Sequence, residues 1–215
     1  MKKTKERNVK VNVKEILKAL DEHYGTDDRC FLSYEKPHEL LIATIMSAQC
    51  TDERVNAVSK VLFEKYRSVS DFAHADINEL ERDIHSVGFY HMKARHIIDA
   101  CRMLLADYGG EVPSGIDELT GLPGVGRKTA NVVRGHIFQI PSIVVDTHVK
   151  RVAKRIGLTD ETDPEKVEYA LEKIIPQDHW ILINLQLISH GRSICHSQRP
   201  DCDHCFLAGL CRMRL

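Results

Sequence analysis

The stretch LPGVGRKTAN, residues 122–131, brings a proline, two glycines and an Arg-Lys pair close together. Gly124 and Gly126 can adopt backbone angles that other residues avoid, and they leave room for close backbone approach. A helix that begins after them presents free N–H groups and a positive dipole end, which together bind phosphate. Leu122 and Val125 would pack the turn onto a short helix before it. A plain turn between two helices explains the same residues, so the motif alone leaves both interpretations open.

Lys128 lies in the first turn of the helix predicted after the glycines. The positive end of the helix dipole and the neighbouring Arg127 both disfavour a charged amine at this position. A neutral amine is the form that attacks carbon, so Lys128 is a candidate nucleophile. The alternative is a solvated surface charge, which is the usual state of a lysine.

Asp146 directly follows the apolar run Ile143-Val144-Val145, which indicates a buried segment. A carboxylate at the end of such a segment needs a partner. Asp146 could cap a helix that opens near Thr147, or it could face Lys128.

The four cysteines of the C-terminal tail are spaced C-x6-C-x2-C-x5-C. Crowded cysteines in a reducing compartment indicate metal ligands rather than disulfides. Zinc sites usually pair two C-x2-C knuckles, whereas this tail has one knuckle between two longer arms. We therefore favour a [4Fe–4S] cluster over a single zinc ion, although both are open on spacing alone. The ligands would be Cys195, Cys202, Cys205 and Cys211.

The composition, 43% hydrophobic over 215 residues with a net charge of −1, is typical of a globular protein. It excludes a generic polyanion binder, so nucleic acid would have to bind through a local patch. No run approaches the ~20 apolar residues that span a bilayer. The N-terminal MKKTKERNVK is charged and precedes no apolar run, so we expect no secretory signal, no membrane partner and a cytoplasmic location.

Helical periodicity dominates the rest of the chain. YHMKARHIIDACRMLLADYGG, residues 90–110, predicts a long amphipathic helix that its terminal glycines end. Thr147 is the expected N-cap of a helix that stops at Gly157, and the last helix is expected to end before Gly191. The sequence therefore predicts an all-α fold.

Several motifs, in this order along the chain, resemble the endonuclease III family of helix-hairpin-helix DNA glycosylases. The resemblance runs from about residue 36 to residue 211. It is carried by LLIATIMSAQCTD, VGFYHMKARHI, GEVPSGIDELTGLPGVGRKTANVV, VVDTHVKRV, LISHGRSIC and the four-cysteine tail.

This resemblance implies two helical domains with a cleft between them. A six-helix barrel domain would span residues 26–140 and contain the helix-hairpin-helix at about residues 116–135. An iron–sulfur cluster domain would combine residues 1–25 with residues 141–215. Such proteins act on damaged double-stranded DNA, and we expect a monomer that associates with a prokaryotic nucleoid through DNA.

The resemblance also implies the activity of a bifunctional DNA glycosylase and AP lyase of base excision repair. Lys128 and Asp146 would face each other across the cleft. Lys128 would release an oxidised pyrimidine through a Schiff base, and β-elimination would then cut the strand 3′ to the abasic site. Related monofunctional enzymes carry serine or tyrosine at the position of Lys128, and neither forms a Schiff base.

Two residues are implied to fill the space that the extruded base leaves, Gln49 from SAQCTD and Phe89 from VGFY. Phe89 replaces the more familiar leucine, and its alternative role is core packing. His148 would line the cleft or be a structural histidine. The remaining DNA contacts are assigned to Leu122, Gly124, Val125, Gly126 and Arg199.

A basic stripe of Lys150, Arg151, Lys154 and Arg155 is either a solvated face or a phosphate-binding surface. The competing functional hypothesis is a DNA-binding or sensing protein without catalysis. Such a binder needs neither a nucleophilic lysine nor a catalytic aspartate.

Overall fold

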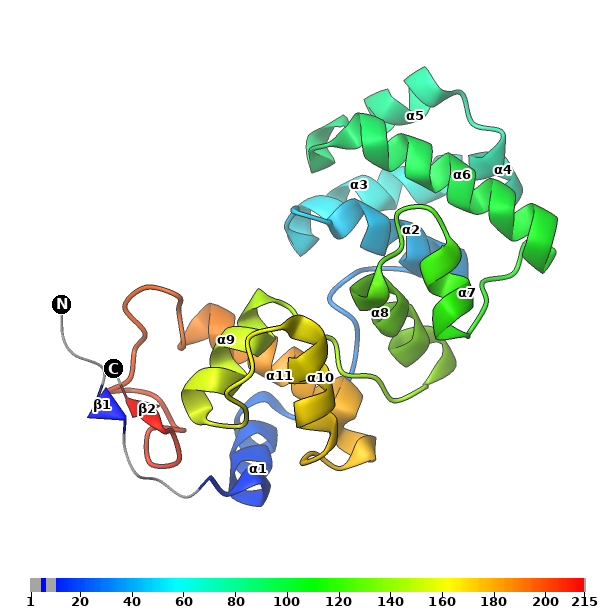
Figure 1. Ribbon diagram of the computed structural model, residues 1–215. Helices are drawn as coiled ribbons and strands as arrows, with labels where there is room; N and C mark the ends of the chain where they lie inside the picture. Colours follow the sequence, from blue (N-terminus) through cyan, green and yellow to red (C-terminus); the bar gives the residue numbers. More distant parts are fainter. Residues whose placement is uncertain (1–4, 7–10, 215) are drawn as a thin grey trace. The chain divides into compact units, whose positions relative to one another are not determined.

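The computed structural model describes residues 5–6 and 11–214, and the chain divides into two compact units (Figure 1). The central unit is Arg29–Ile140. The terminal unit combines Met1–Asp28 with Pro141–Leu215.

The central unit is built from seven α-helices and one 3-10 helix among its described residues. In chain order they are α2 (Pro37–Ser47), α3 (Asp52–Lys65), α4 (Val69–Ala73), α5 (Ile77–Asp83), η1 (His85–Val87), α6 (Tyr90–Tyr108), α7 (Ile116–Gly121) and α8 (Arg127–Phe138).

Helix α2 forms the centre of this unit, since every residue from position 38 to position 46 is buried. It packs against α3, α6 and α8, and α4 packs along α6. A helix that is buried on all sides is mostly apolar, and six of the nine residues in HELLIATIM are apolar. The long helix α6 ends at Gly109 in a left-handed conformation, as its sequence predicts.

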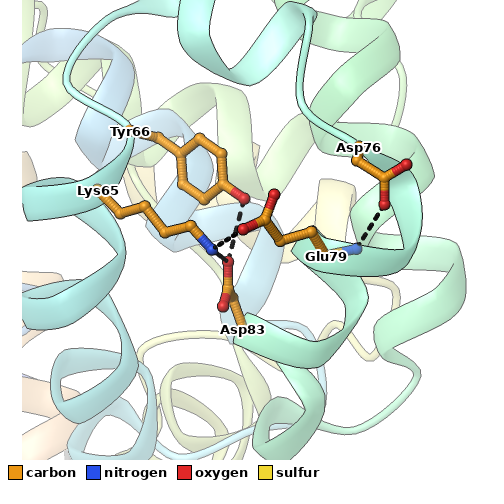
Figure 2. A network of polar contacts seen from close by, with 5 residues as sticks. All are labelled: Lys65, Tyr66, Asp76, Glu79 and Asp83. Carbon is orange, nitrogen blue, oxygen red and sulfur yellow. Dashed lines mark hydrogen bonds and ion pairs between the residues drawn. The ribbon is translucent and has the colours of Figure 1, made fainter.

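A polar network joins the end of α3 to α5 (Figure 2). The Lys65 ammonium lies 2.5 Å from Oδ2 of Asp83 and 2.8 Å from Oε1 of Glu79, and both carboxylates raise the pKa of Lys65. The Tyr66 hydroxyl donates to the same Asp83 oxygen at 3.0 Å. Asp76 caps α5 by accepting a hydrogen bond from the Glu79 N–H. These bonds are partly exposed, so they contribute only modestly to the stability of the unit.

The terminal unit contains a short antiparallel ladder and four α-helices among its described residues. The ladder pairs β1 (Lys5–Glu6) with β2 (Met213–Arg214), and the helical elements are α1 (Val13–Tyr24), α9 (Thr147–Ile156), α10 (Pro164–Glu172), η2 (Gln177–His179) and α11 (Trp180–Ser193).

Buried polar side chains of α11 hold neighbouring backbone in place. The Asn184 amide accepts from the Val144 N–H and donates to the Ser142 carbonyl, both at 3.0 Å. The Gln186 amide donates to the Gly25 carbonyl at 3.0 Å. Residues 141–146 form no strand, so these side-chain bonds satisfy backbone groups that a sheet would otherwise pair.

The predicted helix end before Gly191 is wrong, because α11 continues to Ser193. A Cβ on Gly191 would lie 2.8 Å from Nδ1 of His148 and 2.9 Å from Nη2 of Arg151. The glycine therefore allows α9 and α11 to pack closely and does not act as a helix stop.

The predicted all-α fold is confirmed. Among the described residues, no helix combines the length and the hydropathy that crossing a bilayer requires.

Candidate DNA-repair site

The glycine motif forms a tight turn between α7 and α8. The Val125 N–H donates to the Leu122 carbonyl at 3.1 Å, and both side chains are buried, at 5% and 2% exposure. Only the backbone of these two residues could therefore contact DNA. Gly124 has a φ of +77°, and a Cβ there would lie 2.8 Å from the Cβ of His96 on α6. The turn thus requires glycine at position 124 for both conformation and space.

Gly126 precedes α8, and no side chain caps this helix. Its φ of −90° suits any residue, and a Cβ there would have no neighbour within 4 Å. The first N–H groups of α8 therefore point out of an open helix N-terminus, as a phosphate site requires.

Lys128 is the second residue of α8, and its side chain is exposed. It lies within the first turn after the open N-terminus and on the same unit as the glycine turn.

Asp146 is the N-cap of α9, where Thr147 was predicted. Its Oδ1 accepts a hydrogen bond from the Val149 N–H at 2.7 Å. Asp146 also acts on the His148 imidazole, whose pKa burial lowers and Asp146 raises in part. The capping role is thus confirmed. Because Asp146 belongs to the terminal unit, its approach to Lys128 of the central unit stays a prediction.

The basic stripe on α9 has a role that neither sequence interpretation foresaw. Nη2 of Arg151 donates to the Gly191 carbonyl at 3.0 Å and to the Cys195 carbonyl at 3.2 Å, and it lies 3.1 Å from Nδ1 of His148. Arg155 donates to the backbone after Cys195, at 2.6 Å to the carbonyl of the next residue. These two arginines therefore fix the start of the cysteine tail, and the phosphate-binding interpretation of the stripe stays a prediction.

The four tail cysteines line one small cavity. Burial raises the pKa of the Cys211 thiol to about 11 and also raises that of Cys205. Such thiols become thiolates only when a metal or another positive charge compensates them. Among the described residues, no three His, Cys, Asp or Glu side chains converge on a position for a single metal ion.

A buried histidine forms part of the wall of this cavity. His190 is 1% exposed, and its Nε2 lies 3.6 Å from Sγ of Cys205. The Tyr24 hydroxyl is 3.0 Å from Nδ1 of the same ring. Burial lowers the pKa of His190 to about 4, so the imidazole is neutral at physiological pH. The sequence analysis missed this residue, although a histidine in the apolar run LINLQLISH was a signal for it.

Gln49 and Phe89 both have exposed side chains and left-handed backbone conformations, with φ of +54° and +48°. Phe89 is 62% exposed, which excludes the alternative that it packs in the core. Arg199 is likewise exposed with a φ of +50°. The carboxylate of Asp201, in the same loop, accepts from Nδ1 of His204 at 2.9 Å.

The fold and the glycine turn indicate a class of protein. Comparison with known families identifies that class. Residues 42–177 match the model of the HhH-GPD superfamily, described as base excision DNA repair proteins. The chain is 50% identical to endonuclease III of Synechocystis sp. over 183 residues, which are 85% of this chain and 84% of that protein. It is 44% identical to endonuclease III of Bacillus subtilis over 205 residues, 94% of each chain.

A solved structure shows the same similarity. The trapped covalent intermediate of an endonuclease III with DNA superimposes with a TM-score of 0.87 at 48% identity, over 94% of this chain and 97% of that one. The chain belongs to the endonuclease III family. It is therefore an enzyme of base excision repair, a DNA glycosylase with AP lyase activity, as its motifs predicted.

The open N-terminus of α8 gives the first prediction. Gly126→Asp should weaken binding to undamaged and abasic duplexes alike, because an aspartate at an N-cap occupies the N–H groups that would bind phosphate. The protein should stay folded, and its free energy of unfolding should rise by a few tenths of a kcal/mol, roughly. Binding is measured by fluorescence anisotropy over a range of salt concentrations.

Gly126→Ala is the matched control, since it adds a Cβ but no acceptor, and it should bind nearly as the wild type. An unchanged affinity and an unchanged salt slope for Gly126→Asp would show that the hairpin is only a turn.

Proposed function

We propose that Lys128 is the nucleophile that releases oxidised pyrimidines from double-stranded DNA and then cleaves the strand. Its Nζ attacks the anomeric carbon, the glycosidic bond breaks, and the base leaves with the electron pair and takes up a proton. The amine loses its protons as the sugar ring opens to an imine. Abstraction of a proton from C2′ then expels the 3′ phosphate by β-elimination. The observation that carries this proposal is the exposed lysine directly behind the open, glycine-bounded N-terminus of α8.

The covalent chemistry has further support from the relatives. A protein 48% identical to this chain was trapped as a covalent intermediate with DNA. A lysine forms such an intermediate through its amine. A DNA-binding protein without catalysis is the alternative function, and it would not need this chemistry.

Asp146 is proposed to assist departure of the base electrostatically and to help activate the amine. Its Oδ1 accepts from the Val149 N–H, and the carboxylate also influences His148. A group that caps a rigid helix is held in a fixed direction, which favours electrostatic assistance.

DNA is proposed to contact the backbone of residues 122–126 and the side chains of Gln49, Phe89, His148 and Arg199. Gln49 and Phe89 would fill the space vacated by the extruded base. The 62% exposure of Phe89 supports this role, because it leaves the ring accessible to DNA.

The four tail cysteines are proposed to hold a [4Fe–4S] cluster. All four line one cavity, which supports a metal group that they share. The cluster supplies folding energy to a tail that has little apolar core of its own. Arg151 and Arg155 anchor the backbone at its first ligand.

The predicted domain limits, residues 26–140 and residues 1–25 with 141–215, belong to the same proposal. The compact units Arg29–Ile140 and Met1–Asp28 with Pro141–Leu215 support it. We also propose that the protein is a monomer and that it lies in the cytoplasm, associated with the nucleoid.

Lys128→Gln should abolish borohydride-trapped adducts and strand cleavage, because glutamine cannot form an imine. Binding to an abasic duplex should persist, since the hairpin backbone is unchanged. Gel assays on duplexes that carry thymine glycol or an abasic site measure both activities. Lys150→Gln, a change of charge on the other unit, should still trap. Efficient trapping by Lys128→Gln would mean that another amine is the nucleophile.

Asp146→Asn should slow base release by ~10²–10⁴ but slow cleavage of a preformed abasic site much less, because that site has no base to expel. Asparagine caps helices as well as aspartate does, so α9 should keep its stability. Asp163→Asn is the matched control, since Asp163 caps α10 through the Lys166 N–H at 3.1 Å. Equal slowing of both steps by Asp146→Asn would contradict the proposed role.

Cys202→Ser should lose iron, sulfide and visible absorbance, and its terminal unit should unfold at lower temperature than that of the wild type. Cys30→Ser, in the central unit, is the control and should retain the iron. Iron, sulfide and zinc are measured on protein that is prepared anaerobically. Stoichiometric zinc without iron in the wild type would overturn the cluster.

A further inference from the structure

The start of α6 reverses the usual distribution of apolar and charged side chains. Phe89 and Met92 are 62% and 56% exposed, whereas Lys93 is only 4% exposed. A buried lysine is costly unless its ammonium is well bonded, and burial lowers the pKa of this one. A buried lysine at position 93 therefore calls for an explanation.

The Lys93 ammonium makes two short hydrogen bonds to backbone. Nζ donates to the Met46 carbonyl and to the Val87 carbonyl, each at 2.8 Å. Met46 lies in the last turn of α2, and Val87 is the last residue of η1. Carbonyls at helix ends lack intrahelical donors, so a cation suits both, and the dipole of α2 favours it further at Met46. The Lys93 side chain thus supplies hydrogen-bond donors to unpaired carbonyls at the ends of two helices.

The two helix ends lead directly into the two loops that carry the proposed hole-filling residues. Gln49 follows Met46 by three residues, and Phe89 follows Val87 by two. Both are non-glycine residues in left-handed conformations, with φ of +54° and +48°. Such conformations persist only where the surroundings impose them, and they concentrate at functional sites. Lys93 is the anchor that the two loops share.

We propose that Lys93 is a positioning residue that clamps the Gln49 loop and the Phe89 loop together, so that both enter the space of an extruded base as one rigid pair. This inference rests on the proposed role of Gln49 and Phe89. Separate flexible loops would lose conformational entropy on inserting into DNA, whereas a preassembled pair has already lost it. Lys93 contacts neither the sugar nor the base in this proposal, and it acts through the loops.

The expected consequence is specific to steps that extrude a paired base. Lys93→Met keeps the length of the side chain but leaves the two carbonyls without a donor. Excision of thymine glycol from a duplex should slow by about tenfold or more, because extrusion has to overcome pairing and stacking energy of a few kcal/mol. Excision of the same lesion placed opposite an abasic spacer should slow much less, since no partner base holds it. The measured quantity is the ratio of the two single-turnover rates.

Loss of folded protein lowers both rates equally, so it does not move this ratio. Lys65→Met is the matched control in the same unit, because the Lys65 ammonium bonds to Asp83 and Glu79 of α5 (Figure 2) and to neither loop. Its ratio should equal that of the wild type. Should Lys93→Met fail to fold, Lys93→Gln, which keeps one donor group, carries the comparison and should give an intermediate ratio.

A double-mutant cycle separates this inference from the function on which it rests. Phe89→Ala should shift the same ratio, and adding Lys93→Met to it should shift the ratio little further. If Lys93→Met leaves the ratio unchanged, or if its effect on the ratio adds fully to that of Phe89→Ala, the proposed clamping role of Lys93 is wrong. The proposed function of the enzyme is unaffected by that result. An unchanged ratio in Gln49→Ala and Phe89→Ala overturns the hole-filling role instead. A wild type that neither excises nor traps overturns the proposed function itself.

Discussion

Backbone groups that lie outside helices must still find hydrogen-bond partners, and because the described residues form only one short ladder, side chains supply many of them. Asn184 pairs with residues 142 and 144 of the segment that leads into α9. Asn56 does the same before α2, accepting from the Ser33 N–H and donating to the Phe31 carbonyl, both at 2.9 Å. Lys93 completes the ends of α2 and η1. The bonds of Asn184 and Lys93 fix segments that lead into residues proposed to act on DNA.

This constraint explains where the reactive groups lie. A helix pairs its own backbone N–H and C=O groups except at its two ends. The unpaired groups at an end are therefore either capped by a side chain or available to bind a ligand. Asp146 closes the start of α9 by capping it. The start of α8 has no side-chain cap and is followed by the exposed Lys128. Asp146 is thus held at a capped helix N-terminus, whereas Lys128 follows an uncapped one. The two proposed catalytic residues therefore have different surroundings, in keeping with their different proposed roles.

Local signals in the sequence were sufficient for much of this architecture. The left-handed stops at Gly109 and Gly157 were predictable, because only glycine adopts that conformation without strain. The tight turn at Gly124 followed from the same property. Residues that depend on distant partners could not be predicted in this way. Gly191 looks like a helix stop until α9 is placed beside it. Arg151 looks like a surface charge until the backbone of the tail reaches it.

Lys93 falls between these two cases. It is in helical phase with the buried residues Ile97 and Leu104 of α6, so the sequence does place it on the apolar face. Its carbonyl partners belong to α2 and η1, which no periodicity identifies. The spacing of the four cysteines predicted a shared metal group, but only the folded tail shows them around one cavity.

The most direct test of the central claim locates the covalent bond. Wild-type protein is reacted with an abasic duplex in the presence of borohydride, digested with nuclease and trypsin, and mapped by mass spectrometry. We expect one reduced sugar adduct, on Lys128, and a peptide in which trypsin no longer cleaves after that residue. An adduct on any other amine, or no adduct at all, would contradict the account.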